Sequence, residues 1–147
     1  MNKEDFVTYE QALDLKKLGF REPCLYYYFN QTLYPNDVYA HRIDRSSFHR
    51  VYSVEALSKV LQQYYEPTIC DAPTLAQAQK WLRKEKNLSL EPCFVRRDYT
   101  DDKQWYCFIT NISNKVNGLD DPDLDDYFST YEEALSAGIT ECLKLLK

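Results

Sequence analysis

The chain has 147 residues, of which 44% are hydrophobic and 28% charged, a balance typical of a globular domain rather than a disordered segment. Its net charge of −5 disfavours nucleic acid as a partner, because a phosphate backbone repels an acidic protein unless basic residues gather on one face. The start lacks the apolar run of a secretory signal, and no stretch approaches the roughly 18 apolar residues of a membrane span. We therefore expect a cytoplasmic protein without a membrane partner.

Four segments combine a hydroxyl residue with a following helical pattern of apolar residues. They begin at Thr8, Ser53, Thr74 and Thr130. Each threonine is followed three positions later by a glutamine or glutamate (Gln11, Gln77 and Glu133), the spacing of a capping box. Ser53 has its glutamate one position early, so only a simple cap is expected there.

The expected helix ends and faces follow from the same pattern. The first helix should end at Gly19 and the third near Asn87. One face of the last helix should be buried, namely Tyr131, Leu135, Gly138, Cys142 and Leu146. A glycine inside a helix costs about 1 kcal/mol relative to alanine, so Gly138 indicates a close contact with a second helix or a sheet.

Three segments have strand patterns, at residues 24–29, 88–97 and 104–112. The first is apolar on both faces and is expected to be an interior strand. The other two are separated by turn-forming residues 98–103, which predicts a hairpin. Residues 31–37 are expected to form a turn region, and a strand within 38–52 stays open.

The tripeptide Glu-Pro-Cys occurs twice, ending at Cys24 and Cys93, and each copy follows a threonine-capped helix. Each copy is also followed by another capped helix. This order of landmarks predicts one domain, residues 1–147, made of two α-β-β-α halves at 8–65 and 74–147 with a linker at 66–73. The expected fold is α+β, with a small mixed sheet of three to four strands packed by helices.

Five cysteines and no Cys-x-x-Cys pair indicate a reducing compartment. All five thiols are expected to be reduced. Burial is predicted for four of them, Cys24, Cys93, Cys107 and Cys142, as small hydrophobic residues.

Signatures of catalysis and of metal binding are missing from the sequence. It contains no nucleophile elbow, phosphate-binding loop, dinucleotide fingerprint or zinc-protease motif. The acidic run at residues 120–126 departs from a calcium loop, because Asp126 stands where the sharp turn needs glycine. We expect a protein that is not an enzyme and that carries no cofactor or metal.

Two basic clusters are candidate anion sites in this acidic chain. The first, Arg42, Arg45, His49 and Arg50, is the candidate ligand-binding site, since arginines can fork onto phosphate or carboxylate groups. The second comprises Lys80, Arg83, Lys84 and Lys86, close in sequence to Arg96 and Arg97. With interleaved aromatic residues, such a patch could hold phosphate or stacked single-stranded bases.

The chain resembles a family of small uncharacterised proteins from gut Bacteroides genomes, their phages and mobile elements. The stretches that carry the resemblance are MNKEDFVTYEQAL, LGFREPCLYYY, DAPTLAQAQKWLR, STYEEALSAGI and CLKLL. The resemblance implies a phage or mobile-element context and no particular chemistry. In addition, residues 120–146 are similar to the last strand and helix of HicB-type antitoxins, which bind and silence a small toxin.

These observations favour a non-catalytic accessory protein that binds another protein. The 13 tyrosines support this, because a tyrosine ring with a polar tip suits a binding surface as well as a half-buried position. Two alternatives stay open, a small anionic ligand or nucleotide held by the arginine cluster, and an antitoxin-type inhibitor. A homodimer is also open.

Overall fold

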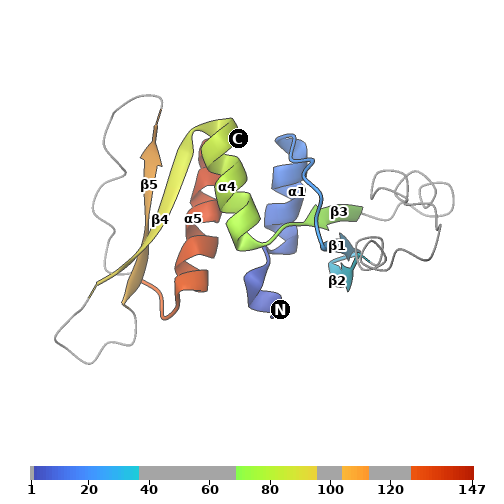
Figure 1. Ribbon diagram of the computed structural model, residues 1–147, viewed down its shortest axis with the longest axis horizontal. Coiled ribbons are helices and arrows are strands. Elements are labelled where there is room, and N and C mark those ends of the chain that lie inside the picture. The colour runs from blue at the N-terminus through green and yellow to red at the C-terminus, as the bar shows by residue number, and fades with distance from the viewer. Residues whose placement is uncertain (1, 37–68, 96–103, 113–126) are drawn as a thin grey trace, which may run out of the picture. The chain divides into compact units, whose positions relative to one another are not determined.

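The computed structural model describes residues 2–36, 69–95, 104–112 and 127–147 (Figure 1). Its contacts divide the chain into two compact units, one of residues Thr8–Pro73 and one of Met1–Val7 with Thr74–Lys147. Each unit contains helix and strand, which confirms the α+β class. The single-domain organisation stays a prediction.

The unit Thr8–Pro73 has one described helix and a three-stranded antiparallel sheet. Its elements are α1 (Tyr9–Lys17), β1 (Tyr26–Phe29), β2 (Thr32–Pro35) and β3 (Ile69–Ala72). The strand order is β2-β1-β3, so the aromatic strand lies in the centre of the sheet, as its two-sided apolar pattern predicted.

Two segments of this unit form strands that the sequence analysis had placed elsewhere. Residues Thr32–Pro35, expected within a turn region at 31–37, form strand β2 instead. The chain reverses at Asn30 and Gln31, which both have positive φ (46° and 68°), and β2 follows at once. In the predicted linker, residues Ile69–Ala72 form β3, and Ile69 and Cys70 are each 1% exposed.

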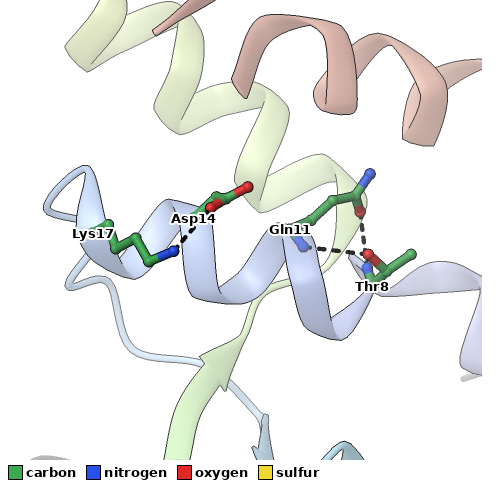
Figure 2. Close-up of polar contacts among 4 residues, drawn as sticks. All are labelled: Thr8, Gln11, Asp14 and Lys17. Atoms are coloured by element: carbon green, nitrogen blue, oxygen red, sulfur yellow. Dashed lines mark hydrogen bonds and ion pairs between the residues drawn. The ribbon is translucent and has the colours of Figure 1, made fainter. Parts of the chain in front are cut away.

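Helix α1 is closed at both ends by the predicted signals. At its start, the Gln11 N–H donates to Thr8 Oγ1 (3.3 Å) and the Thr8 N–H donates to Gln11 Oε1 (2.8 Å), which completes the capping box (Figure 2). At its end, Gly19 has φ 98° and the Phe20 N–H donates to Leu15 O (2.9 Å). This is a Schellman ending, in which the buried Phe20 and Leu15 supply the accompanying apolar contact.

The unit that contains both chain ends is built on a hairpin covered by two helices (Figure 1). Its elements are the short 3-10 turn η1 (Lys3–Asp5), α4 (Leu75–Lys86), β4 (Leu88–Phe94), β5 (Trp105–Asn111) and α5 (Tyr131–Leu145). Strands β4 and β5 pair antiparallel, which confirms the predicted hairpin. Helix α5 packs on both strands, and α4 packs on β4 and α5.

The prediction of one mixed sheet is wrong for the described strands. They form two separate sheets, and every pairing in them is antiparallel. Both hairpins pair strands that follow one another closely along the chain, which needs no crossover connection, and β3 joins β1 in the antiparallel sense although it comes much later in the chain.

The duplication of an α-β-β-α half is not confirmed. Cys24 precedes β1, which lies between two strands, whereas Cys93 lies inside β4, which has β5 as its neighbour among the described strands. The last helix of the first half, predicted after Ser53, lies outside the described residues. What the two segments share is a threonine-capped helix followed by the first strand of an antiparallel hairpin.

Helix α4 follows the sequence prediction closely. Thr74 and Gln77 form the second complete capping box, and Asn87 ends the helix in the left-handed region (φ 55°). Trp81 is 5% exposed and belongs to the buried face of α4.

Helix α5 departs from the prediction in two respects. Thr130 Oγ1 accepts from the Glu133 N–H (3.1 Å), but Glu133 Oε2 accepts from the Ser129 N–H (3.0 Å), so the third capping box is incomplete. Tyr131, expected to be buried, is 37% exposed, and Leu146 is half-buried. The buried face is instead carried by Ala134, Leu135, Gly138, Ile139, Cys142 and Leu143.

Gly138 lies at the closest contact between α5 and the hairpin, as its mid-helix position predicted. A Cβ atom added at Gly138 would overlap Cys107 Sγ and would lie 3.0 Å from Leu90 Cδ2. Glycine is therefore required here for helix and sheet to approach.

The complete capping box at Thr74 gives a stability prediction. Replacing Thr74 by alanine should lower the free energy of unfolding by about 1 kcal/mol, because the Gln77 N–H loses its acceptor, Thr74 Oγ1, and the capping box is broken. Urea denaturation followed by circular dichroism measures this. Thr130→Ala is the comparison, and it should lower the free energy of unfolding by less, because the capping box at Thr130 is incomplete. Equal losses in the two variants would show that the bond from the Thr74 N–H to Gln77 Oε1 adds no stability.

Candidate functional site

The candidate ligand-binding residues Arg42, Arg45, His49 and Arg50 lie outside the described residues. So do the acidic run at 120–126 and the two arginines at 96–97. In the described part of the chain, the residues with the chemistry of a binding site are the thiols, the basic residues of α4 and two groups of aromatic side chains.

All five cysteines are free thiols, as predicted. Cys24, Cys70 and Cys142 are buried, whereas Cys93 and Cys107, expected to be buried, are only half-buried. Cys93 is paired with Tyr106, so it lies on the face of the hairpin opposite to Cys107, whereas Cys107 lies against Gly138 of α5.

Burial makes the enclosed thiols weak nucleophiles. Desolvation raises the pKa of Cys70 to about 12, with Lys16 opposing the shift and Asp71 adding to it. Desolvation likewise raises the pKa of Cys142 to about 12, with the nearby Cys107 and Glu141 adding to it. Because the thiolate is the reactive form, these groups are poor candidates for covalent chemistry at neutral pH.

Neither a metal site nor a membrane span is found among the described residues. No group of three or more His, Cys, Asp or Glu side chains is arranged to hold an ion in the ranges that the structure describes. None of the described helices is both long and apolar enough to cross a bilayer.

The most exposed aromatic group of the hairpin unit comprises Phe94, Trp105 and Tyr131, named here the aromatic cluster. Phe94 and Trp105 face each other across the β4–β5 register, with ring centroids 5.3 Å apart and planes at 64°. Trp105 then meets Tyr131 edge to face, with centroids 5.5 Å apart and planes at 86°. Phe94 is 54% exposed and Tyr131 37%, so large parts of these rings face solvent.

Backbone hydrogen bonds fix the position of the aromatic cluster. The Phe128 N–H donates to Trp105 O (2.7 Å) and the Trp105 N–H donates to Phe128 O (3.0 Å). This bridge ties the residues before α5 to the start of β5, and so places Tyr131, the first residue of α5, beside Trp105. The three rings are therefore held by two strands and a helix rather than by a loop.

A second aromatic group lies on the sheet of the other unit. Tyr27 and Tyr34 are directly paired between β1 and β2 and stack with centroids 5.9 Å apart, while Phe29 meets Tyr34 edge to face at 6.4 Å. Tyr34 is 41% exposed. Asp71 of β3 is paired with Tyr27 on the same face, and burial raises the pKa of its carboxyl group while Lys16 and Arg21 oppose the shift.

The sequence analysis did not identify either aromatic group. Residues paired in an antiparallel sheet lie on the same face, so the register decides which aromatic side chains meet. The predicted strand bounds, 88–97 and 104–112, do not give the observed register: pairing residue 97 with residue 104 would place Phe94 opposite Cys107, whereas the structure pairs Phe94 with Trp105.

The basic residues of α4 were identified from the sequence and are placed on the helix surface. Lys80, Arg83 and Lys84 are exposed, and Lys86 extends over the Trp81 ring, its Nζ 5.2 Å from the ring centroid. Lys84 pairs with Glu85 at 3.2 Å.

We compared the chain with models of protein families, with curated proteins and with solved structures, and none of them matches it.

Proposed function

We propose that this chain is a non-catalytic protein that acts by binding another protein through the aromatic cluster of Phe94, Trp105 and Tyr131. The observation that carries the proposal is the exposure of Phe94 and Tyr131 on either side of the half-buried Trp105, with all three rings held by two strands and a helix. Tryptophan and tyrosine are the residues over-represented at the centres of protein interfaces.

The energetics of association favour such a surface. A ring that two strands and a helix already hold in place loses little conformational freedom on binding, so more of its burial contributes to affinity. Phe94 at 54% and Tyr131 at 37% exposure leave apolar area that a partner can remove from water.

The proposal of a non-catalytic role rests on the chemistry of the described residues. The buried thiols are held in their protonated form by desolvation, as the raised pKa of Cys24, Cys70 and Cys142 indicates. Among the described residues, no group of three or more His, Cys, Asp or Glu side chains is arranged to hold a metal ion that could take part in catalysis.

The biological setting that we propose for this binding is a phage or mobile element of gut Bacteroides, with a host protein as the partner. An antitoxin-type role is a special case of the same proposal. It is supported by the arrangement of Phe128, which pairs with β5 directly before α5, the strand-then-helix order of the region that is similar to HicB-type antitoxins.

Capture from a Bacteroides lysate tests the proposal with matched surface variants. The chain and its Phe94→Ser/Tyr131→Ser variant are immobilised, with Trp105 left in place to keep the bridge to Phe128. The control carries Ile112→Ser and Leu145→Ser, which remove comparably exposed apolar side chains elsewhere (49% and 58% exposed).

The proposal requires one host protein that the parent and the control retain and that the aromatic variant loses, at unchanged melting temperature. Retention by all three chains would exclude the aromatic cluster as the binding surface. A Tyr34→Ser variant tests the second aromatic group in the same experiment.

The anionic-ligand alternative depends on Arg42, Arg45, His49 and Arg50, which lie outside the described residues. Its test is a separate one. Replacing Arg42, Arg45 and Arg50 with serine should weaken binding of a nucleotide or inorganic phosphate and flatten its salt dependence, with little change in melting temperature. If that variant unfolds, the arginines are structural and this alternative is excluded.

A further inference from the structure

Helix α4 presents a surface whose charge is opposite to that of the whole chain. Lys80, Arg83 and Lys84 are three and four positions apart, so they share one face of the helix, and all three are exposed. We call these three residues the basic face. The chain as a whole carries a net charge of −5.

The orientation of the basic face is fixed by packing on the opposite side of the helix. Leu75, Ala78 and Leu82 are buried there, and Gln79 Nε2 donates to Leu90 O (2.7 Å), which ties α4 to β4. The basic side chains therefore cannot turn toward the core of this unit without breaking that packing.

Few of the described residues offset the charge of the basic face. In the described ranges, Lys80 and Arg83 form no ion pair or hydrogen bond, and Lys84 has only the exposed pair with Glu85. Like charges at positions i and i+4, as at Lys80 and Lys84, slightly destabilise a helix. Arg83 and Lys84 gain from the helix dipole in the last turn, but Lys80 lies too far from the end to do so.

The single aromatic residue of α4 argues against nucleic acid as the occupant. Single-stranded nucleic acid binds by stacking its bases on exposed rings beside basic residues. Trp81 is 5% exposed, and Lys86 Nζ lies over its ring. A base therefore has no aromatic surface on this helix to stack on, which leaves charge as the means of recognition.

We propose that the basic face of α4 is a docking surface for an acidic segment of a protein partner, with carboxylates spaced to meet Lys80, Arg83 and Lys84. This surface is separate from the aromatic cluster, and its role does not depend on the function proposed for those rings. Exposed charge pairs add little affinity each but steer association and set the orientation of the partner.

A direct binding measurement tests this inference on the full chain. Fluorescence anisotropy of a labelled oligoglutamate peptide is recorded with the parent, with Lys80→Gln/Arg83→Gln/Lys84→Gln, and with a control of equal charge change. The control carries Lys3→Gln, Lys17→Gln and Lys144→Gln, exposed lysines on three other elements.

At low ionic strength, the basic-face variant should bind the peptide about tenfold more weakly than the parent, while the control stays within about twofold. Molar salt should abolish the difference, because it screens charges beyond about 3 Å. Circular dichroism must show that α4 remains folded in the variant, and glutamine is chosen because it is a good helix former.

Three outcomes would overturn the inference. Absence of peptide binding to the parent would do so, as would equal weakening in the control. Tighter binding of a single-stranded oligothymidylate of matched charge, lost in the same variant, would reassign the surface to nucleic acid. The Phe94→Ser/Tyr131→Ser variant keeps the basic face, so it should bind the oligoglutamate peptide as the parent does. The proposals for the aromatic cluster and for the basic face can therefore be refuted independently.

Discussion

Replacing Gly138 by valine is expected to lower the free energy of unfolding by about 3 kcal/mol, the upper range for inserting methyl groups into a packed core. Gly138 is buried where α5 meets the hairpin. A Cβ there would overlap Cys107 Sγ and lie 3.0 Å from both Cys107 Cβ and Leu90 Cδ2. The gain in helix propensity over glycine is under about 1 kcal/mol and does not offset this clash. Urea denaturation of the purified variant gives the value.

A double-mutant cycle shows whether the close contact is the cause. In a Cys107→Ala background the sulfur that a new Cβ would overlap is gone, so the cost of Gly138→Ala or Gly138→Val should fall by at least half. An unchanged cost in that background would mean that Gly138 is required for a different reason.

Raising the pH from about 8 to about 10.5 should destabilise the protein by several kcal/mol, because four thiols resist ionisation. Desolvation raises the pKa of Cys70, Cys107 and Cys142 to about 12 from an ordinary 9.0, and it raises that of Cys24 as well. Above the ordinary value the unfolded chain loses these protons while the native chain keeps them. Stability therefore falls with rising pH, by about 1.4 kcal/mol for each thiol and each pH unit.

A single substitution isolates the contribution of one thiol. Cys142→Ala removes one of these four groups, so the free energy of unfolding of the variant should fall less steeply between about pH 9 and 10.5, by about 1.4 kcal/mol per pH unit. Denaturation at several pH values measures both slopes. Identical slopes for parent and variant would show that Cys142 ionises equally easily in the native and unfolded chains.

The sequence predicts helices better than sheets in this chain because helix signals are local. A threonine cap, a glutamine three positions later and a left-handed stop at Gly19 or Asn87 all lie within one helix. Strands β2 and β3 were missed for opposite reasons. The turn at Asn30 and Gln31 lacks the glycine that usually marks a tight hairpin, and β3 is too short to show an alternating pattern.

Sheet membership depends on contacts between distant residues, which is why the single mixed sheet was wrong. Strand β3 pairs with β1, which lies more than thirty residues earlier in the chain, and nothing in the sequence of residues 69–72 indicates which strand it pairs with. The repeated Glu-Pro-Cys indicated equivalent positions, yet Cys24 precedes its strand and Cys93 lies within one.

For the candidate sites, the sequence predicts the charged surface of α4 but not the exposed aromatic side chains of the hairpin. Lys80, Arg83 and Lys84 on an amphipathic helix must lie opposite its apolar stripe, and they do. Phe94, in contrast, has the pattern of an ordinary strand residue, and nothing in the local sequence indicates that it is 54% exposed.

Calorimetric titration of the purified host partner, once captured, tests the central claim most directly. We predict that Phe94→Ser/Tyr131→Ser weakens binding by at least about a hundredfold, since aromatic residues at an interface centre contribute about 2 kcal/mol or more. The Ile112→Ser/Leu145→Ser control should bind as the parent does. An aromatic variant that binds its partner with the affinity of the parent would contradict the claim that this protein acts through the aromatic cluster.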